Sequence, residues 1–254
     1  MGLKTTQIAL FAAMAMMIIA CKKDAETPPP PGVPESTTAT VRISYDFVNG
    51  GQAFDHHSTF TDAHGRKVGV TLLKFYAYDV LLTDDASATV ADLRDRIMLV
   101  NAIEGGNNFE LGTMDPAHVH NVNLSFGLDS ASSYGFADQA TAPAPLNDPG
   151  MTWMWNVANG RMFIRFEGFL DANDNGMADD GEGFEYHGIG HDMVAVHWHE
   201  HIHTDVVAGG TFTIGLKVDM STLVHELALD GMYHNDGPET LQLMQSLAAA
   251  TSPL

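Results

Sequence analysis

Four histidines alternate with other residues in the segment HWHEHIH, residues 197–203. In an extended strand, successive side chains point to opposite faces, and same-face neighbours lie about 6.6–6.8 Å apart. All four imidazoles would therefore share one face: they belong to His197, His199, His201 and His203. Imidazoles placed in this way can converge on one metal ion at N–metal distances of about 2.0 Å. A single His-x-His pair is more often an exposed polar face, but four histidines in seven residues favour a metal site.

The ligand types limit which metal such a site would hold. The chain has 13 histidines, including a second His-x-His pair at His118 and His120, and a single cysteine, Cys21. If Cys21 lies outside the folded domain, the domain offers no thiolate. An imidazole set without thiolates suits copper, zinc or nickel, and the Irving–Williams order makes copper the tightest-bound of the divalent ions.

The segment DANDNGMADDGE, residues 171–182, has the spacing of an EF-hand calcium loop. Carboxylate or amide side chains occupy the ligand positions, a glycine stands at the sharp turn, and the residue after it offers a backbone carbonyl. The predicted calcium ligands are Asp171, Asn173, Asn175, Met177, Asp179 and Glu182. The flanking segments alternate like strands, so the sequence predicts a hairpin tip held by calcium. The alternative is an acidic, solvated turn without an ion.

Period-two alternation dominates the chain and predicts the elements that must position these side chains. Besides the histidine tract, it predicts strands over residues 41–48, 70–82, 96–102, 119–128, 161–170, 183–189 and 211–220. Many short strands separated by polar turns are typical of an all-β fold, an antiparallel β-sandwich. A short C-terminal helix is predicted over residues 238–250, with Pro238 near its start.

The first forty residues have the composition of a leader and a tether. Residues 1–20 contain one lysine and a short apolar run, which predicts a lipoprotein signal peptide that ends before Cys21. Residues 21–40 are rich in Pro and Thr and predict a tether from the lipidated cysteine to a single domain over residues 41–254. We expect a cell-envelope protein, on the periplasmic side of the outer membrane or at the cell surface, that touches the membrane only through its lipid.

The charge balance excludes one class of partner. The formal net charge is −20, from 32 acidic and 12 basic residues. Nucleic-acid binding needs clustered Lys and Arg to neutralise phosphates, so no nucleic-acid partner is expected. Cations are the natural ligands of such a surface.

Several segments together resemble the MbnP-like family, periplasmic or lipid-anchored copper-binding proteins related to MbnP and CorA. The specific part is GMTWMWN followed by MFIRFEG, within residues 150–168; VTLLKFYAYDVLL at 70–82, VNLSFGLDS at 122–130 and FEYHGIG at 184–190 also match in family order. The resemblance implies a β-sandwich that binds copper through histidines. It also implies that a tryptophan of the site is oxidised to kynurenine by a partner di-haem enzyme of the cytochrome c peroxidase type.

The resemblance also assigns residues. His187 corresponds to the histidine of the family's Tyr-His strand, and Trp153 and Trp155 correspond to family tryptophans; Trp198 is a third candidate for modification. The calcium-like loop and the histidine tract look like additions to the family pattern.

Two hypotheses follow. The first is a lipoprotein that binds copper through His187 together with the tract histidines His197, His199, His201 and His203. The second is a calcium-stabilised recognition module on the cell surface, with exposed aromatics as its contacts and no transition metal. No enzymatic activity is expected, because no metalloprotease helix motif and no nucleophile–base arrangement is present.

Overall fold

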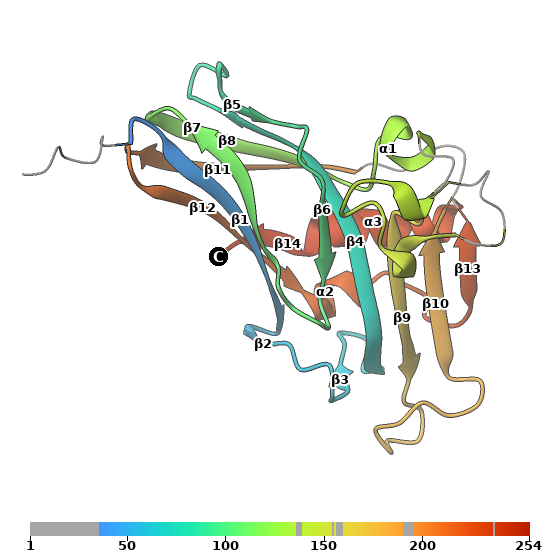
Figure 1. Ribbon diagram of the computed structural model, residues 1–254. Coiled ribbons are helices and arrows are strands. Elements are labelled where there is room, and N and C mark those ends of the chain that lie inside the picture. Colours follow the sequence, from blue (N-terminus) through green and yellow to red (C-terminus); the bar gives the residue numbers. More distant parts are fainter. Residues whose placement is uncertain (1–35, 136–138, 154, 156–159, 190–195, 236) are drawn as a thin grey trace, which may run out of the picture. The chain divides into compact units, whose positions relative to one another are not determined.

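Two β-sheets face one another in the computed structural model, which describes residues 36–135, 139–153, 155, 160–189, 196–235 and 237–254 (Figure 1). Cys21, the signal segment 1–20 and most of the predicted tether lie outside the described residues. Residues 35–254 form one compact unit. Among the described residues, no helix is long and apolar enough to cross a membrane.

The smaller sheet is built around the first strand. Its order is β14 (Thr251–Pro253), β12 (Thr211–Asp219), β1 (Ala39–Asn49) and β2 (Gln52–Ala53), and β7 (Asn108–Met114) also pairs with β1. β1 and β12 are parallel, with Ile43 opposite Ile214. Parallel strands cannot be joined by a hairpin and need a long crossover connection, which the chain between β1 and β12 provides.

The larger sheet is built around β4 (Lys67–Thr83), the longest strand described. Along one path the order is β11 (Val196–Val206), β8 (Ala117–Phe126), β4, β9 (Ile164–Leu170), β10 (Gly183–Gly188) and β13 (Met232–Asn235). β3 (Phe60–Thr61), β5 (Thr89–Leu93) and β6 (Met98–Asn101) also pair with β4. β10 and β13 are parallel, whereas the other pairs of this sheet are antiparallel. The predicted β-sandwich is confirmed, with mixed rather than purely antiparallel sheets.

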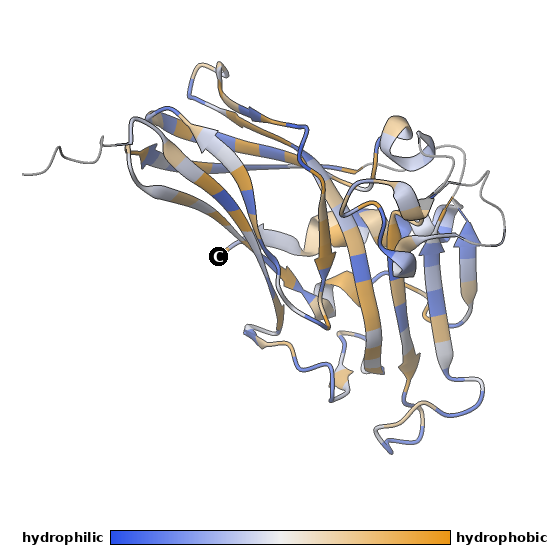
Figure 2. Ribbon diagram, viewed as in Figure 1, coloured by the Kyte–Doolittle hydropathy of each residue, from blue (hydrophilic) through white to orange (hydrophobic). Residues whose placement is uncertain are grey.

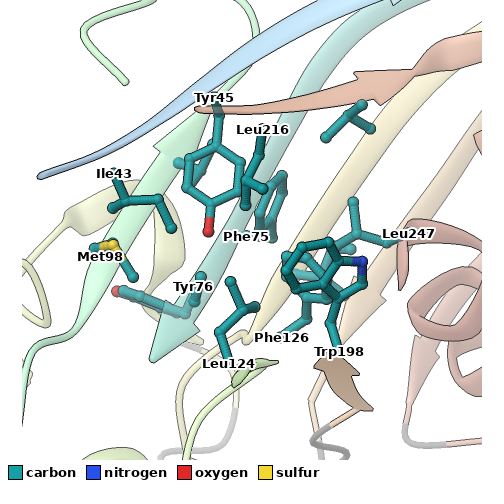
Figure 3. Packing of buried hydrophobic residues seen from close by; sticks show 14 of the residues in the cluster. Ile43, Tyr45, Phe75, Tyr76, Met98, Leu124, Phe126, Trp198, Leu216 and Leu247 are labelled. Carbon is teal, nitrogen blue, oxygen red and sulfur yellow. The ribbon is translucent and has the colours of Figure 1, made fainter. Parts of the chain in front are cut away.

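The core lies between the two sheets and follows the alternation of the strands (Figure 2). Tyr45 of β1 meets Phe75 of β4 edge-on, with ring centroids 5.9 Å apart, and Phe75 meets Phe126 of β8 in the same manner. Trp198 of β11 and Leu247 lie at the same interface (Figure 3). Leu247 belongs to helix α3 (Pro238–Ala250), which has the predicted bounds.

Two shorter helices precede α3 in the chain. They are α1 (Ser130–Tyr134), whose N-cap is Asp129, and α2 (Met220–Val224), whose N-cap is Asp219. The Asp129 carboxylate accepts a hydrogen bond from one backbone N–H of the first turn, and the Asp219 carboxylate accepts from two. α2 follows β12 directly and packs against α3. The chain after α2 leads into β13, which precedes α3.

Candidate metal centres

One group of possible metal ligands lies on β10 and β13, and we call Glu185, His187 and His234 the β10 site. Glu185 and His187 are two residues apart on β10, so their side chains share one face. The parallel pairing sets His234 of β13 directly beside His187. Phe184 and Tyr186, which alternate with them, are buried in the core. The alternation of this short strand therefore sends apolar groups inward and metal-binding groups to the opposite face.

The donor atoms of the β10 site converge. The two imidazole rings stack with centroids 4.2 Å apart and planes within 1° of parallel. Glu185 Oε2 lies 3.0 Å from Nε2 of His234 and 3.9 Å from Nε2 of His187. One ligand atom from each residue falls within 4.8 Å of the others, which is close enough for all three to bind one ion.

Glu167 of β9 supports this group from the neighbouring strand. Its Oε1 accepts a hydrogen bond from Nε2 of His187 at 2.8 Å and also accepts hydrogen bonds from Arg165. These bonds, the one from His187 foremost, lower the pKa of Glu167 against the opposing effect of its burial. His187 Nδ1 is buried and makes no hydrogen bond among the described residues. Because Nε2 carries the proton donated to Glu167, the lone pair of the neutral His187 ring is on Nδ1, and Nδ1 is the nitrogen that would bind a metal.

Trp153 covers the β10 site. Its ring lies edge-on to His187 and His234, with centroid distances of 6.3 and 5.6 Å. Trp155 stacks on Trp153 at 5.9 Å and is 88% exposed. Trp198 instead lies in the core, where its indole N–H donates to the Thr251 carbonyl (Figure 3). Of the three candidate tryptophans, Trp153 is the one against which described histidine rings pack.

The segment that carries Trp153 is tied to the strands by a buried cation. Thr152 forms a β-bridge with Arg161, whose side chain is completely buried. The Arg161 guanidinium donates to the carbonyls of Leu146, Ser132 and Ser133. This arginine therefore holds helix α1 and the chain before Trp153 against the start of the β9 segment.

The histidine tract forms most of β11, and its predicted alternation is present. The four imidazoles are exposed, whereas Trp198 between them is buried. His197 Nδ1 lies 2.7 Å from the Ser125 hydroxyl, and His199 Nδ1 donates to Asn123 Oδ1 at 2.8 Å. Both partners are on β8, so these two imidazoles lean onto the neighbouring strand.

A second group of possible metal ligands lies where β11 meets the start of β8. It consists of Asp85, His118, His120 and His203, which we call the β8 site. One ligand atom from each of these residues lies within 4.8 Å of the others. His118 also donates to Asp205, and this hydrogen bond raises its pKa.

The five predicted copper ligands are thus divided. His187 belongs to the β10 site and His203 to the β8 site, while His197, His199 and His201 belong to neither group among the described residues. The strand pairing explains the division, because β10 pairs with β9 and β13, whereas β11 pairs with β8.

The predicted calcium loop connects β9 to β10, and its flanks are strands as expected (Figure 1). Asp171 accepts hydrogen bonds from the backbone N–H groups of Asn175 and Gly176. Glu182 closes the loop by accepting from the N–H groups of Ala172 and Asp179. Asp179 accepts from the side-chain amides of Asn173 and Asn175, whereas the Met177 side chain is exposed and only its carbonyl is a predicted ligand.

Sequence reasoning did not select several residues of these groups. Glu185 and Glu167 could have been found by the Glu-x-His pattern of β10 and by the strand that precedes it. His234 carried no local signal, because its role depends on the parallel pairing of β13 with β10. His118 and His120 were noticed as a pair, but Asp85 lies in a turn far away in the sequence.

Comparisons with known proteins place the chain in a family. The MbnP family model matches residues 38–241. The solved structure of MbnP from Methylosinus trichosporium is similar, with a TM-score of 0.53 and 15% sequence identity, over 81% of this chain and 87% of that one. At this identity the structural likeness shows a shared fold. No curated protein matches the sequence. Because the family model covers most of the chain, this protein belongs to the MbnP family.

Proposed function

We propose that this protein is a cell-envelope copper-binding protein and that the β10 site holds the copper. The observation that carries the proposal is the stacked pair His187 and His234 with one oxygen of Glu185 beside both, under the ring of Trp153. Family membership adds to it, because the MbnP-like resemblance implies copper bound through histidines. The chemistry is binding and not catalysis.

The donor set suits the ion. Imidazole is a preferred ligand of copper, and the described part of the chain has no thiolate to favour another metal. The hydrogen bond from His187 to Glu167 fixes the orientation of the ring, as carboxylate partners do for metal-binding histidines. Because protons compete with the metal for the imidazole nitrogens, copper affinity should fall as the pH is lowered.

Trp153 is the tryptophan that we propose for oxidation to kynurenine. It is supported by its contacts with both histidine rings, which no other candidate tryptophan makes among the described residues. Trp155 is exposed and stacked on Trp153, so a partner oxidase, proposed to be a di-haem cytochrome c peroxidase-type enzyme, could dock there. Conversion to kynurenine removes one carbon and adds one oxygen, and mass spectrometry of the peptide would locate it.

The test of the copper site is metal analysis of the protein purified from its native host, with intact mass measured in parallel. We expect near-stoichiometric copper in the wild type. His187→Ala together with His234→Ala should remove one tightly bound equivalent in a copper titration, whereas His199→Ala, in the tract but in neither group, should remove none. Retention of all copper by the folded double variant would refute the assignment.

We further propose that Cys21 carries lipid and anchors the protein to the outer membrane. The apolar leader that ends at this cysteine supports the anchor. Cys21→Ser should move the protein from the membrane fraction to the soluble fraction in fractionated cells, and an unchanged distribution would contradict the anchor.

The second candidate function is a calcium-stabilised recognition module. It is favoured by the 88% exposure of Trp155, a flat aromatic surface available to a glycan or protein. Trp155→Ala should then abolish binding to the cell-surface ligand, and the native protein should contain calcium and no copper. If copper is instead present in the native protein and lost with His187 and His234, the copper function stands.

A further inference from the structure

We propose that the β8 site is a second metal site, distinct from the β10 site, that binds a divalent ion of the zinc type through Asp85, His118, His120 and His203. The β10 site is in register with the middle of β4, whereas the β8 site lies beyond its C-terminal end. Lys74 of β4 is in register with Arg165 and, through it, with His187. Asp85 follows eleven residues later, a path of about 36 Å along an extended strand. Figure 1 shows the β4–β5 turn and the β10–β13 pair well apart.

Three neighbouring segments supply the ligands. His118 and His120 are two residues apart on β8, so their rings share one face. β8 pairs with β4 on one side and with β11 on the other. Asp85 therefore reaches the histidines from the turn after β4, and His203 reaches them from β11. No one segment could form this site alone, because each gives only one or two ligands.

The turn that carries Asp85 is fixed by its neighbour. Asp84 Oδ1 accepts hydrogen bonds from the backbone N–H groups of Ala86 and Ala88. The Asn121 amide donates to the Thr83 hydroxyl and ties the end of β4 to β8. These bonds leave the Asp85 carboxylate free to turn toward β8, where both of its oxygens lie near imidazole nitrogens.

The backbone departs from regular strand geometry at His203. The register between β11 and β8 shifts between His201 and Thr204, and His203 has a positive φ of 43°. A positive φ is unfavourable for a residue with a side chain, and such residues are concentrated at functional sites. The irregularity turns the His203 ring toward β8, where its centroid lies 4.1 Å from that of His120 and 6.1 Å from that of His118.

Asp205 selects the tautomer of His118 that can bind a metal through Nε2. Its Oδ1 lies 2.7 Å from His118 Nδ1 and accepts that proton, so the lone pair of the neutral ring is on Nε2. Nε2 lies 3.6 Å from Asp85 Oδ2, on the side of the other ligands. A histidine held by a carboxylate through one nitrogen and by a metal through the other is the usual arrangement in zinc sites.

His120 also has a ring nitrogen that is available to a metal, because this nitrogen makes no hydrogen bond among the described residues. Its Nδ1 is buried and lies 2.6 Å from Asp85 Oδ1, yet the pair lacks hydrogen-bond geometry among the described residues. Two electron-donating atoms that close, without a well-aligned proton between them, fit ligands that face a common cation. Tetrahedral ligand atoms about 2.0 Å from zinc lie about 3.3 Å apart, so a small adjustment would admit the ion.

The donor set selects the class of ion. Three imidazoles and one carboxylate match the nitrogen and oxygen ligands of four-coordinate zinc. Calcium and magnesium prefer sets made of oxygens, so they are poor candidates. The ligands are half-buried or exposed, which makes the site accessible to free ions in solution.

The tract offers matched controls. His197 and His199 are as exposed as His203 and lie on the same strand, but they lean onto Ser125 and Asn123 and are outside the group. If the tract binds metal only because it is rich in histidine, these residues should matter as much as His203. If the β8 site is a built site, they should not.

The experiment is a titration of the purified metal-free protein with Zn²⁺ alone, read by a competing chromophoric chelator. It is performed on the His187→Ala/His234→Ala variant, so that the β10 site cannot contribute and failure of the copper proposal leaves the result interpretable. We expect this variant to bind one equivalent of zinc tightly. Adding His118→Ala and His120→Ala should lower the zinc affinity at least 100-fold. Asp205→Ala should weaken binding about tenfold, and His197→Ala should leave it unchanged.

Equal loss of zinc affinity in the His197→Ala control and in the His118→Ala/His120→Ala variant would overturn the proposal, as would the absence of a tight equivalent. If the multiple variants do not fold, the proposal is tested by crystallography of the wild-type protein. Crystals soaked in Zn²⁺ should show an anomalous peak at the zinc edge among Asp85, His118, His120 and His203. A peak at His197, His199 and His201 alone, or no peak at all, would refute the site.

Discussion

At the scale of single residues, Asp62 illustrates how one charge positions a distant element. It is buried and accepts hydrogen bonds from the backbone and the side chain of Arg66 and from the His64 N–H. Arg66 in turn donates to the carbonyls of Val224 and Leu227, at the end of α2. The pair therefore fixes the chain that leads into β13 and to the histidine of the β10 site.

Replacing Asp62 by Asn should reduce the free energy of unfolding by about 2–3 kcal/mol at pH 7, because it leaves the partly buried Arg66 without its anion. The expected loss is at the lower end for a buried pair, since Arg66 is in part solvated. Urea unfolding at pH 7 measures it. An unchanged unfolding midpoint would contradict the role.

The same substitution should change the pH dependence of stability. Burial raises the pKa of Asp62, but the hydrogen bonds from Arg66 and His64 outweigh burial, and the net pKa is lowered. A lowered pKa gives stability that is present above the unfolded value of about 3.9 and is lost as the pH falls through the folded value. The difference between wild type and Asp62→Asn should therefore shrink below about pH 4. Asp92→Asn is the control: Arg94 lowers the pKa of Asp92 to about 2, but the pair is solvent-exposed, so no measurable change at pH 7 is expected.

Glu167 has a different role, in the orientation of a ligand. Because it accepts the His187 hydrogen bond, Glu167→Gln should lower copper affinity about 10- to 100-fold without removing a predicted ligand. Copper titration followed by quenching of tryptophan fluorescence measures the change. Glu110→Gln, an exposed glutamate paired with Arg42 on β1, is the matched control and should bind copper as the wild type does. Unchanged affinity in Glu167→Gln would show that the hydrogen bond does not orient the ring.

At the scale of elements, the strands with long alternation were predictable and the short ones were not. The segment TFTIGLKVDM predicts β12, and HWHEHIH predicts β11, because their own patterns separate a buried face from an exposed one. β13 has four residues, too few for a pattern, and it is a strand only because β10 pairs with it. The β10 site could therefore be predicted for His187 alone.

We propose that the loop between β9 and β10 binds calcium, and this proposal can be tested by thermal unfolding. Calcium should raise the thermal unfolding temperature of the wild type, and a free concentration about 100-fold above the dissociation constant corresponds to about 2.7 kcal/mol. Glu182→Gln should abolish the shift, because the bidentate glutamate at the last loop position is lost. Asp180→Asn removes an exposed charge between ligand positions and should keep the shift. A wild-type unfolding temperature insensitive to calcium would refute the proposal.

At the scale of the whole molecule, the sandwich was predictable from alternation, but the grouping of the histidines was not. A strand pattern tells which side chains share a face; it does not tell which strands are neighbours. His187 and His203 both looked like ligands of one ion, yet each is completed by residues from distant segments, His234 of β13 in one case and Asp85 of the β4–β5 turn in the other. Non-local pairing across β4, β8 and β13 decides the sites.

That separation predicts that the two metal sites act independently. Mutational effects at sites more than about 10 Å apart with no shared partners usually add within about 0.3–0.5 kcal/mol, or roughly a factor of two. In protein produced without the partner oxidase, in which Trp153 is unmodified, copper affinity at the β10 site can be read from quenching of Trp153. It should differ by less than about twofold between the wild type and the His118→Ala/His120→Ala variant. Trp153→Phe identifies the signal, because it removes the ring that lies against both histidines. A larger change would mean that β4 couples the two sites, and that the irregularity between Tyr78 and Leu81, where its register with β8 shifts, is the place to look for the coupling.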